Sequence, residues 1–281
     1  MPHAPSRAGT PGASDTRTPA PLPDVREPPG AAAQRPGTAL VTGASSGIGA
    51  AVARRLSAEG WRLVLNGRDA GRLAETAAHA AAAVFPEDLT RPAAERRLTR
   101  FALDEVGHLD VLVACAGVGW AGDFTTMTRR AFDEVMEVNL LTTLRLVRQV
   151  LPHMVEAGSG RVVLVGSLAG AVGVRGEAVY SASKAAVAVF ADALRHELRG
   201  TGVGVSLVVP GVVDTPFFER RGAPYARTRP RPVPPERVAD AVWRAAVRGR
   251  DEVYVPAWLR LPVRVRGVAP GLYRRLAATF G

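Results

Sequence analysis

The pair of residues with the clearest chemical potential in this sequence is Tyr180 and Lys184, four positions apart in Tyr-Ser-Ala-Ser-Lys. On a helix this spacing stacks two side chains on one face, so both can touch one ligand. A phenol with its ordinary pKa of about 10 is a weak acid at neutral pH, and an adjacent ammonium lowers that pKa by favouring the phenolate. We therefore predict a proton-transferring pair in which Lys184 tunes Tyr180.

A second chemical feature is the glycine-rich run Thr-Gly-Ala-Ser-Ser-Gly-Ile-Gly at 42–49, which leads into a helical stretch. Glycines allow a tight turn and close backbone approach, and the helix N-terminus offers free N–H groups to a pyrophosphate. The spacing differs from G-x-G-x-x-G, and a strand-to-helix turn without a ligand is the alternative. We expect phosphate contacts from Gly43, Ser45, Ser46, Gly47, Ile48 and Gly49.

The same run also matches the G-x-S-x-G nucleophile elbow of hydrolases, with Ser45 as the nucleophile. A hydrolase of that class has strands before its elbow and a loop histidine after its acid. Here the elbow follows the first expected strand, and the last histidine, His196, falls in a helical run. This order along the chain argues against acyl transfer.

A third candidate is Ser167, which stands thirteen residues before Tyr180 at the end of an expected strand. A hydroxyl at this place could donate a hydrogen bond to a substrate carbonyl. Serine at a strand end is more often a simple turn residue, so the assignment depends on its position relative to Tyr180.

The scaffold for these residues follows from short β-branched runs that alternate with longer helical patterns. Seven strands separated by helix-length segments predict an α/β fold with a doubly wound parallel sheet, the Rossmann arrangement. The strands are apolar throughout, which indicates that both sheet faces are covered and that ligands gather at the carboxyl edge. The expected strands are 39–41, 62–65, 83–85, 111–114, 162–165, 203–209 and 253–255, and the expected helices 48–59, 93–106, 132–154, 179–198 and 235–248.

Composition sets the broad class of protein. With 281 residues, 47% hydrophobic and 22% charged, the chain suits one α/β domain, which we place at 37–257. One cysteine and five scattered histidines provide neither a disulfide pair nor metal-ligand spacing. We see no secretory signal or membrane-spanning stretch, so we expect a soluble cytoplasmic protein without a metal.

The charge is unevenly distributed. The net charge is +10, and from Glu219 onward 14 arginines face five acids. Without a recognisable nucleic-acid module, this surplus favours a solvated surface or contact with anionic lipid over nucleic-acid binding. Lys184 is the one lysine among 36 basic residues, which indicates a requirement that arginine cannot meet.

The two ends of the chain differ from the middle. Residues 1–36 are rich in Pro, Ala and Gly, and we predict disorder there. In the extension 258–281, apolar residues interleave with arginines, which suits an anionic membrane surface, although Pro262 and Pro270 preclude one continuous amphipathic helix. Packing over a substrate pocket or against a neighbouring subunit is the alternative.

Several motifs together resemble the single-domain short-chain dehydrogenase/reductases over about residues 38 to 256. They are TGASSGIG at 42–49, Asp88, Cys-Ala-Gly at 115–117, Asn139, Ser167, YSASK at 180–184 and Pro210-Gly211. The resemblance implies hydride transfer between a nicotinamide coenzyme and a carbonyl or alcohol. It also implies a catalytic set of Asn139, Ser167, Tyr180 and Lys184, with Asn139 bending the long helix and holding a water for proton relay.

The resemblance further implies the coenzyme contacts. Lys184 would bind the nicotinamide ribose, and Cys115 replaces an asparagine usual in the family, which puts local rigidity in doubt. A coenzyme-sensing regulatory protein on the same fold is the other functional class. The remaining expected contacts are Asp88 and Leu89 at the adenine, Val213 and Thr215 at the carboxamide, and Ala116, Gly117, Pro210 and Gly211.

The choice of coenzyme depends on the end of the second strand, Asn66-Gly67-Arg68. NAD enzymes place a carboxylate there for the adenosine ribose, and Gly67 stands in its place. Arg68 offers charge-assisted hydrogen bonds to a 2′-phosphate, although Asp69 beside it weakens the local field. We therefore expect NADP(H) rather than NAD(H).

The substrate is poorly defined by the sequence. We expect the segment 215–234 to cover the pocket, and Trp120, Val174, Phe217 and Phe218 suggest an apolar substrate body, although they could equally be core residues. We expect a small carbonyl or alcohol substrate and a homo-oligomer.

Overall fold

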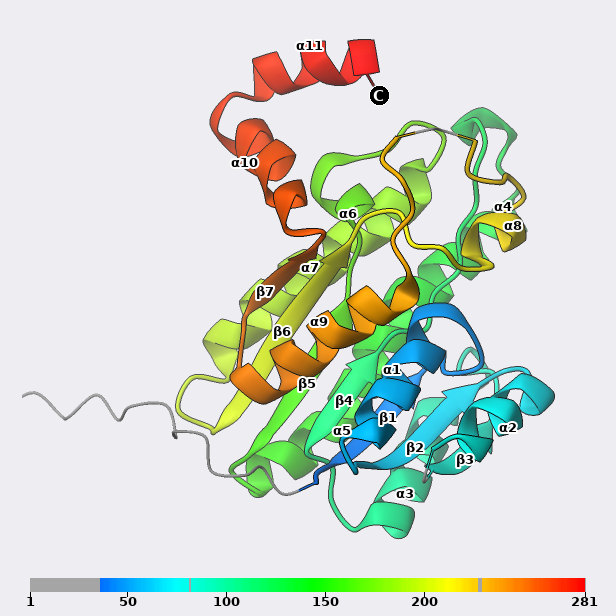
Figure 1. Cartoon of the computed structure of the whole chain (residues 1–281), viewed down its shortest axis with the longest axis vertical. Coiled ribbons are helices and arrows are strands. Elements are labelled where there is room, and N and C mark those ends of the chain that lie inside the picture. Colours follow the sequence, from blue (N-terminus) through cyan, green and yellow to red (C-terminus); the bar gives the residue numbers. More distant parts are fainter. Residues whose placement is uncertain (1–35, 81, 227–228, 281) are drawn as a thin grey trace, which may run out of the picture. The chain divides into compact units, whose positions relative to one another are not determined.

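A parallel seven-stranded sheet forms the centre of the fold (Figure 1), and its strand order is β3-β2-β1-β4-β5-β6-β7. The computed structural model describes residues 36–80, 82–226 and 229–280; the disorder predicted for 1–36 falls, except for Pro36, outside these residues. The order reverses between β1 and β4, so the predicted doubly wound sheet is confirmed. The strands are β1 (Thr38–Thr42), β2 (Arg62–Gly67), β3 (Ala82–Pro86), β4 (Val111–Ala114), β5 (Gly160–Val165), β6 (Val203–Pro210) and β7 (Glu252–Val255).

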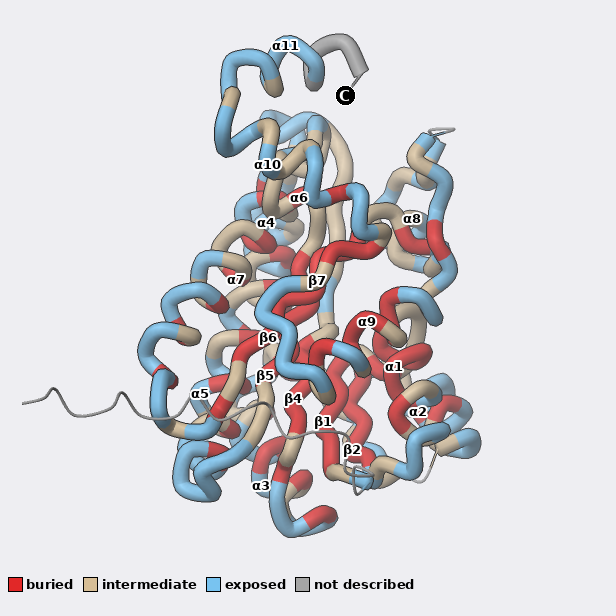
Figure 2. The backbone as a smooth tube through the Cα atoms, turned by 60° about the vertical axis from the view of Figure 1, so that its left-hand side comes forward, coloured by how far each residue is buried: buried red, intermediate tan, exposed pale blue. Residues whose placement is uncertain are grey.

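Helices cover both faces of the sheet, which explains why the strands are apolar throughout. Side chains alternate along each strand, so Leu40 packs on one face while Ala39 and Val41 pack on the other. Figure 2 shows buried residues concentrated along the central strands, such as β1 and β4. One face carries α1 (Gly47–Ala58), α2 (Ala70–Ala78) and α9 (Pro235–Arg248), and the other carries α3 (Ala94–Val106), α5 (Thr142–Glu156) and α7 (Ala178–Glu197).

The long helix expected at 132–154 is divided into three parts. It consists of α4 (Arg129–Met136), the π-helical segment η2 (Glu137–Leu141) and α5. Such widened turns often occur at functional sites, since they redirect side chains and backbone groups. Asn139 lies within η2, and its carbonyl oxygen accepts a hydrogen bond from the Thr143 hydroxyl at 3.0 Å.

Short elements that the sequence pattern does not reveal complete the carboxyl edge. They are α6 (Leu168–Val172), α8 (Phe217–Arg220) and the 3-10 turn η1 (Phe124–Thr126). The longer helix α2 was also not predicted from the sequence pattern. The side chain of Asp69 caps α2 by accepting from the backbone N–H of Arg72 at 3.0 Å, and it pairs with the Arg72 guanidinium at 2.7 Å. Asp69 therefore faces α2, where we had expected it to act on Arg68.

The C-terminal segment continues the packed body beyond β7. The 3-10 turn η3 (Ala257–Leu259) is followed by α10 (Arg260–Val268) and α11 (Pro270–Phe280). Leu259 is fully buried in the core, and a Cβ added at Gly211 would lie 2.7 Å from its Cδ1 atom. Pro262 falls in the first turn of α10 and Pro270 begins α11, positions where a missing N–H is tolerated. Pro270 thus begins a second helix, and Pro262 lies within the first.

Candidate active site

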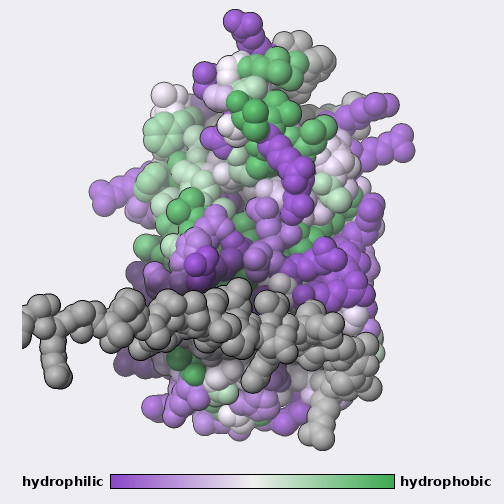
Figure 3. Space-filling model, turned by 90° about the vertical axis from the view of Figure 1, so that its left-hand side faces the viewer, coloured by the Kyte–Doolittle hydropathy of each residue, from purple (hydrophilic) through white to green (hydrophobic). Residues whose placement is uncertain are grey.

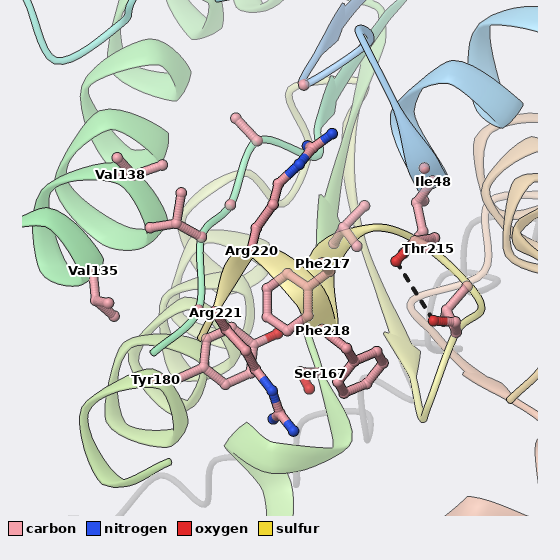
Figure 4. A pocket seen from close by; sticks show the side chains of 18 of the residues that line it. Ile48, Val135, Val138, Ser167, Tyr180, Thr215, Phe217, Phe218, Arg220 and Arg221 are labelled. Carbon is pink, nitrogen blue, oxygen red and sulfur yellow. Dashed lines mark hydrogen bonds between the residues drawn. The ribbon is translucent and has the colours of Figure 1, made fainter. Parts of the chain in front are cut away.

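A cavity of about 760 Å³ opens at the carboxyl edge of the sheet, and Figure 4 shows part of its lining. It brings together residues from the turn after β1, the ends of β2, β4, β5 and β6, and helices α7 and α8. Every site residue predicted from the sequence lines it except Asn139, which is fully buried behind its wall. The cavity also takes in the four residues expected to form an apolar substrate surface.

The turn after β1 is shaped by contacts that exclude side chains. Gly43 has φ +67°, and a Cβ there would lie 2.9 Å from the Ala116 Cα atom. The Thr42 hydroxyl accepts hydrogen bonds from the backbone N–H groups of Cys115 at 3.1 Å and Ala116 at 3.2 Å. These contacts fix the turn against the end of β4 and direct the N-terminus of α1 into the cavity.

The first turn of α1 can receive an anion. Its N-cap residue, Ser46, makes no side-chain cap, and residues 46–49 line the cavity with backbone N–H groups that the helix leaves unpaired. A second unused group is the Thr142 hydroxyl on the cavity wall, a buried oxygen without a hydrogen-bond partner among the described residues. The glycine cradle and the open helix end fit the pyrophosphate of a dinucleotide coenzyme.

Tyr180, Ser167 and Lys184 meet on one side of the cavity. Tyr180 lies in the first turn of α7, and Lys184 is buried one turn further on, with its Nζ donating to the carbonyl oxygen of Val165 at 3.0 Å. Ser167 caps α6 by accepting from the N–H of Ala169 at 3.1 Å, and its hydroxyl lowers the pKa of Tyr180. The predicted phenol and hydroxyl therefore line the same cavity.

Burial controls the ionisation of this pair. It raises the pKa of Tyr180 to about 12, against the lowering effects of the Ser167 hydrogen bond and of Arg221. It lowers the pKa of Lys184 to about 8. The direction for Tyr180 is opposite to the one that the i, i+4 spacing predicts, because desolvation of the phenolate dominates and Lys184 donates to a backbone carbonyl.

Asn139 fastens the loop after β4. Its Oδ1 accepts from the N–H of Val118 at 2.8 Å, and its Nδ2 donates to the Val118 carbonyl at 2.9 Å and to the Ser183 hydroxyl at 3.2 Å. Together with Thr42, this clamp holds the loop that begins with Cys115. Burial raises the pKa of the Cys115 thiol to about 12, so the thiol is neutral and is no nucleophile at ordinary pH.

Aromatic rings cover Tyr180. The ring centroids of Tyr180 and Phe217 are 5.4 Å apart, those of Phe217 and Phe218 5.5 Å, and those of Phe218 and Tyr225 5.3 Å. We call α8 and the loop to Tyr225 the aromatic cover. The cover gives this part of the cavity an apolar wall next to the phenol.

Two arginines that no sequence motif singles out join the aromatic cover to the rest of the site. Arg221 forms a buried ion pair with Glu177, the residue that precedes α7, and stacks over Phe218 at 4.6 Å. Arg220 points away from the rings (Figure 4), and its Nη1 donates to the Ser46 hydroxyl at 3.0 Å. The sequence offered no signal beyond an arginine-rich region.

The chain belongs to the short-chain dehydrogenase family, since a family model described as "short chain dehydrogenase" matches residues 37–226. It is therefore an NAD(P)-dependent oxidoreductase that acts on CH–OH or C=O groups. Among its relatives, the ketoacyl reductase HetN of Nostoc sp. is 36% identical over 255 residues, or 87% of this chain and 89% of that protein.

Solved structures agree with this assignment. A short-chain dehydrogenase from Sphingobium yanoikuyae in complex with NADPH has a TM-score of 0.74 and 31% identity, covering 86% of this chain and 95% of that chain. A short-chain dehydrogenase/reductase from Burkholderia phymatum in complex with NAD has a TM-score of 0.76 and 28% identity, covering 84% and 95%. A nicotinamide coenzyme is thus common to both neighbours.

The described residues offer neither a helix that could span a bilayer nor a set of metal ligands. None of the helices in ranges 36–80, 82–226 and 229–280 is both long and apolar enough to cross a bilayer. The same ranges contain no group of three His, Cys, Asp or Glu side chains placed to hold a metal ion.

Proposed function

We propose that this protein is an NADP(H)-dependent carbonyl reductase or alcohol dehydrogenase in which Tyr180 is the general acid and base. The observation that carries the proposal is that Tyr180, Ser167 and Lys184 lie together on the wall of a coenzyme-sized cavity. The test is a panel of ketones, aldehydes, quinones and alcohols, assayed with both coenzymes by nicotinamide absorbance. No turnover with any member would contradict it.

In this mechanism the protein's side chains handle the oxygen of the substrate. The bound coenzyme supplies or accepts the hydride. Ser167 donates a hydrogen bond to the carbonyl oxygen, and Tyr180 transfers the proton to it. A pKa of about 12 keeps the phenol protonated at neutral pH, which suits carbonyl reduction. Lys184 would bind the ribose hydroxyls, and Asn139 would hold the relay water beside η2.

The preference for NADP(H) is assigned to Arg68. Its guanidinium lies at the cavity wall, half-exposed, 4.0 Å from the Asp88 carboxylate and 3.8 Å from the Glu134 carboxylate. Both ion pairs are weak at this exposure, so Arg68 can turn to a 2′-phosphate. Aspartate cannot replace Gly67 without displacing Ser45, because a Cβ at Gly67 would lie 2.9 Å from the Ser45 Cβ. Arg68 is therefore the better position to change.

Arg68→Ala is expected to lower the preference for NADPH over NADH by about tenfold or more, the size of a lost charge-assisted hydrogen bond. The measurement is kcat/KM for each coenzyme at a fixed substrate concentration. Arg72→Ala is the matched control, since Arg72 is a comparably exposed arginine that pairs with Asp69 on α2. An unchanged preference in Arg68→Ala would remove Arg68 from the coenzyme site.

Arg220 is assigned to the pyrophosphate, because it extends from α8 to Ser46 at the open N-terminus of α1. Arg220→Gln should raise the KM for NADPH and NADH alike by about tenfold, since the lost contact is to a group common to both coenzymes. Arg237→Gln, on the exposed side of α9, serves as the control. Equal KM values for Arg220→Gln and wild type would exclude the contact.

We further propose an apolar substrate, a homo-oligomeric assembly and a cytoplasmic location. The aromatic cover fits a substrate with an apolar body, and the protein acts in the cytoplasm. A homo-oligomer would bury exposed apolar side chains on neighbouring elements, Leu141 of η2 and Val189 of α7. The mass of the protein in solution tests the assembly, and a monomer at assay concentration would contradict it.

A further inference from the structure

The C-terminal helices present large apolar side chains to solvent. Leu261 is 65% exposed and Val268 89% exposed on α10, and Leu272 and Leu276 are exposed one turn apart on α11. Trp258, in η3, is also exposed. We call these five residues and the arginines between them the tail surface. Figure 3 shows apolar side chains gathered around hydrophilic ones at the end of the fold where these helices lie.

The charge of the tail surface has one sign. Residues 256–281 contain five arginines and neither aspartate nor glutamate. Arg264 is exposed on α10, three residues after Leu261 and four before Val268, so it shares their helix face. Arg274 is exposed on α11. Guanidinium groups form bidentate hydrogen bonds with phosphate, and apolar side chains in the same surface can enter the acyl boundary of a bilayer. The combination fits an anionic lipid surface.

A second copy of the chain fits this surface less well. In a two-fold contact the same patch faces itself, so arginines would oppose arginines in a region without acids of its own. By contrast, an anionic bilayer satisfies the arginines and covers the apolar residues together. The exposed Val189 on α7 belongs to a different helix and is the better candidate for contact between copies.

The tail surface is anchored beside the active site. The Arg266 guanidinium donates to the carbonyl oxygen of Ala171, and the Tyr273 hydroxyl donates to that of Val172 at 3.4 Å. Both acceptors lie at the end of α6, which begins after Ser167. Residues 168 and 169 of α6 line the cavity. A bilayer on the tail surface would therefore lie close to the catalytic hydroxyl.

We propose that η3, α10 and α11 dock this protein on anionic bilayers, and that the cavity takes an apolar ketone or alcohol dissolved in the membrane. The proposed docking depends only on the tail surface, whereas the proposed membrane-dissolved substrate also rests on the proposed function. The aromatic cover, with Phe217 and Phe218 next to Tyr180, gives such a substrate an apolar wall on leaving the lipid.

Vesicle flotation of the full chain tests docking. The protein should float with vesicles of phosphatidylcholine mixed with phosphatidylglycerol, and remain below with phosphatidylcholine alone. Arg264→Gln with Arg274→Gln should weaken the binding roughly thirtyfold, if each arginine contributes about the usual amount at an anionic surface. Leu261→Gln with Leu272→Gln should also weaken it, at the same net charge.

The control is Phe124→Gln, which removes an apolar side chain of similar exposure, 61%, from η1, outside the tail surface. It should float like wild type. All substituted positions are exposed, and thermal melts with masses in solution establish that each variant is folded and assembled like wild type. Docking by the tail surface is overturned if wild type fails to float, or if both double variants float as well as wild type.

Activity tests the substrate half separately. The Leu261→Gln, Leu272→Gln variant should reduce a long-chain ketone embedded in anionic vesicles at least tenfold more slowly than wild type, and a short water-soluble ketone at the wild-type rate. Equal rates on the embedded ketone would overturn delivery from the membrane. Loss of both activities in wild type would contradict the proposed function and would leave the flotation result standing.

Discussion

Tyr180→Phe should lower turnover by at least a hundredfold, the usual contribution of a positioned general acid, while coenzyme binding stays nearly unchanged. The substitution keeps the ring that packs against Phe217 and removes only the phenolic hydroxyl. Folding should therefore survive, and the loss should fall on the proton-transfer step. A hundredfold loss corresponds to about 2.7 kcal/mol of barrier height.

The measurement combines a coenzyme fluorescence titration with the rate of NADPH oxidation at saturating substrate. Tyr225→Phe is the matched control, because Tyr225 also lines the cavity and its hydroxyl donates to the carbonyl oxygen of Pro230 at 2.8 Å. It should stay within a few-fold of wild type. Near wild-type turnover in Tyr180→Phe would mean that another group transfers the proton.

Lys184→Arg should abolish most turnover in a folded protein. Lys184 is buried, and its Nζ atom lies close to Gly117, because a Cβ added at Gly117 would be 3.6 Å from it. The site therefore holds a compact ammonium. A guanidinium is wider, spreads its charge and fixes its donors in a fork, which prevents it from donating to Val165 and to ribose hydroxyls from the same position. Steady-state kinetics at saturating NADPH measure the loss. Activity within about threefold of wild type, some 0.7 kcal/mol, would show that any cation serves.

Lys184→Met separates charge from packing. Burial lowers the pKa of Lys184 from 10.5 to about 8, so the folded state disfavours the ammonium. This pKa shift lowers the stability of the folded protein at pH 7 by about 3 kcal/mol. The hydrogen bond from Lys184 to Val165 offsets about 1 to 2 kcal/mol of that loss. The variant should therefore be inactive and yet more stable than wild type at pH 7, by about 1 to 2 kcal/mol.

The stability gain of Lys184→Met over wild type should depend on pH. The unfolded chain holds the lysine proton up to a higher pH than the folded protein, so the burial cost is complete below pH 8. It is relieved as the pH rises from about 8 toward 10.5. The stability difference between Lys184→Met and wild type should shrink over that window, measured as free energies of unfolding in urea. A difference independent of pH would mean that Lys184 is not buried as a cation.

Regular elements were well predicted from the sequence because their hydrophobic patterns are long and local. All seven strands were located, with differences of one or two residues at their ends. By contrast, α6 and α8 have five and four residues, too few for a periodic signal, and contacts with distant parts of the chain stabilise them. The break in the long helix at η2 depends on tertiary contacts of Asn139, such as those with Val118 and Ser183.

The site residues that belong to sequence motifs could be predicted. The carboxyl edge collects residues that follow strands, so Gly43, Ser167 and Pro210 were expected to meet before their geometry was known. The raised pKa of Tyr180 was not predictable, because it depends on burial under rings more than thirty residues away. The same holds for Arg220, whose contact with Ser46 joins positions 174 apart.

The buried Leu259 has a consequence for regulation. It lies against Gly211, which lines the cavity, and it is directly continuous with α10. A displacement of the C-terminal helices would therefore bear on the cavity wall through one side chain. If docking moves η3, the bilayer and the coenzyme become linked ligands, and each must change the other's affinity by the same factor.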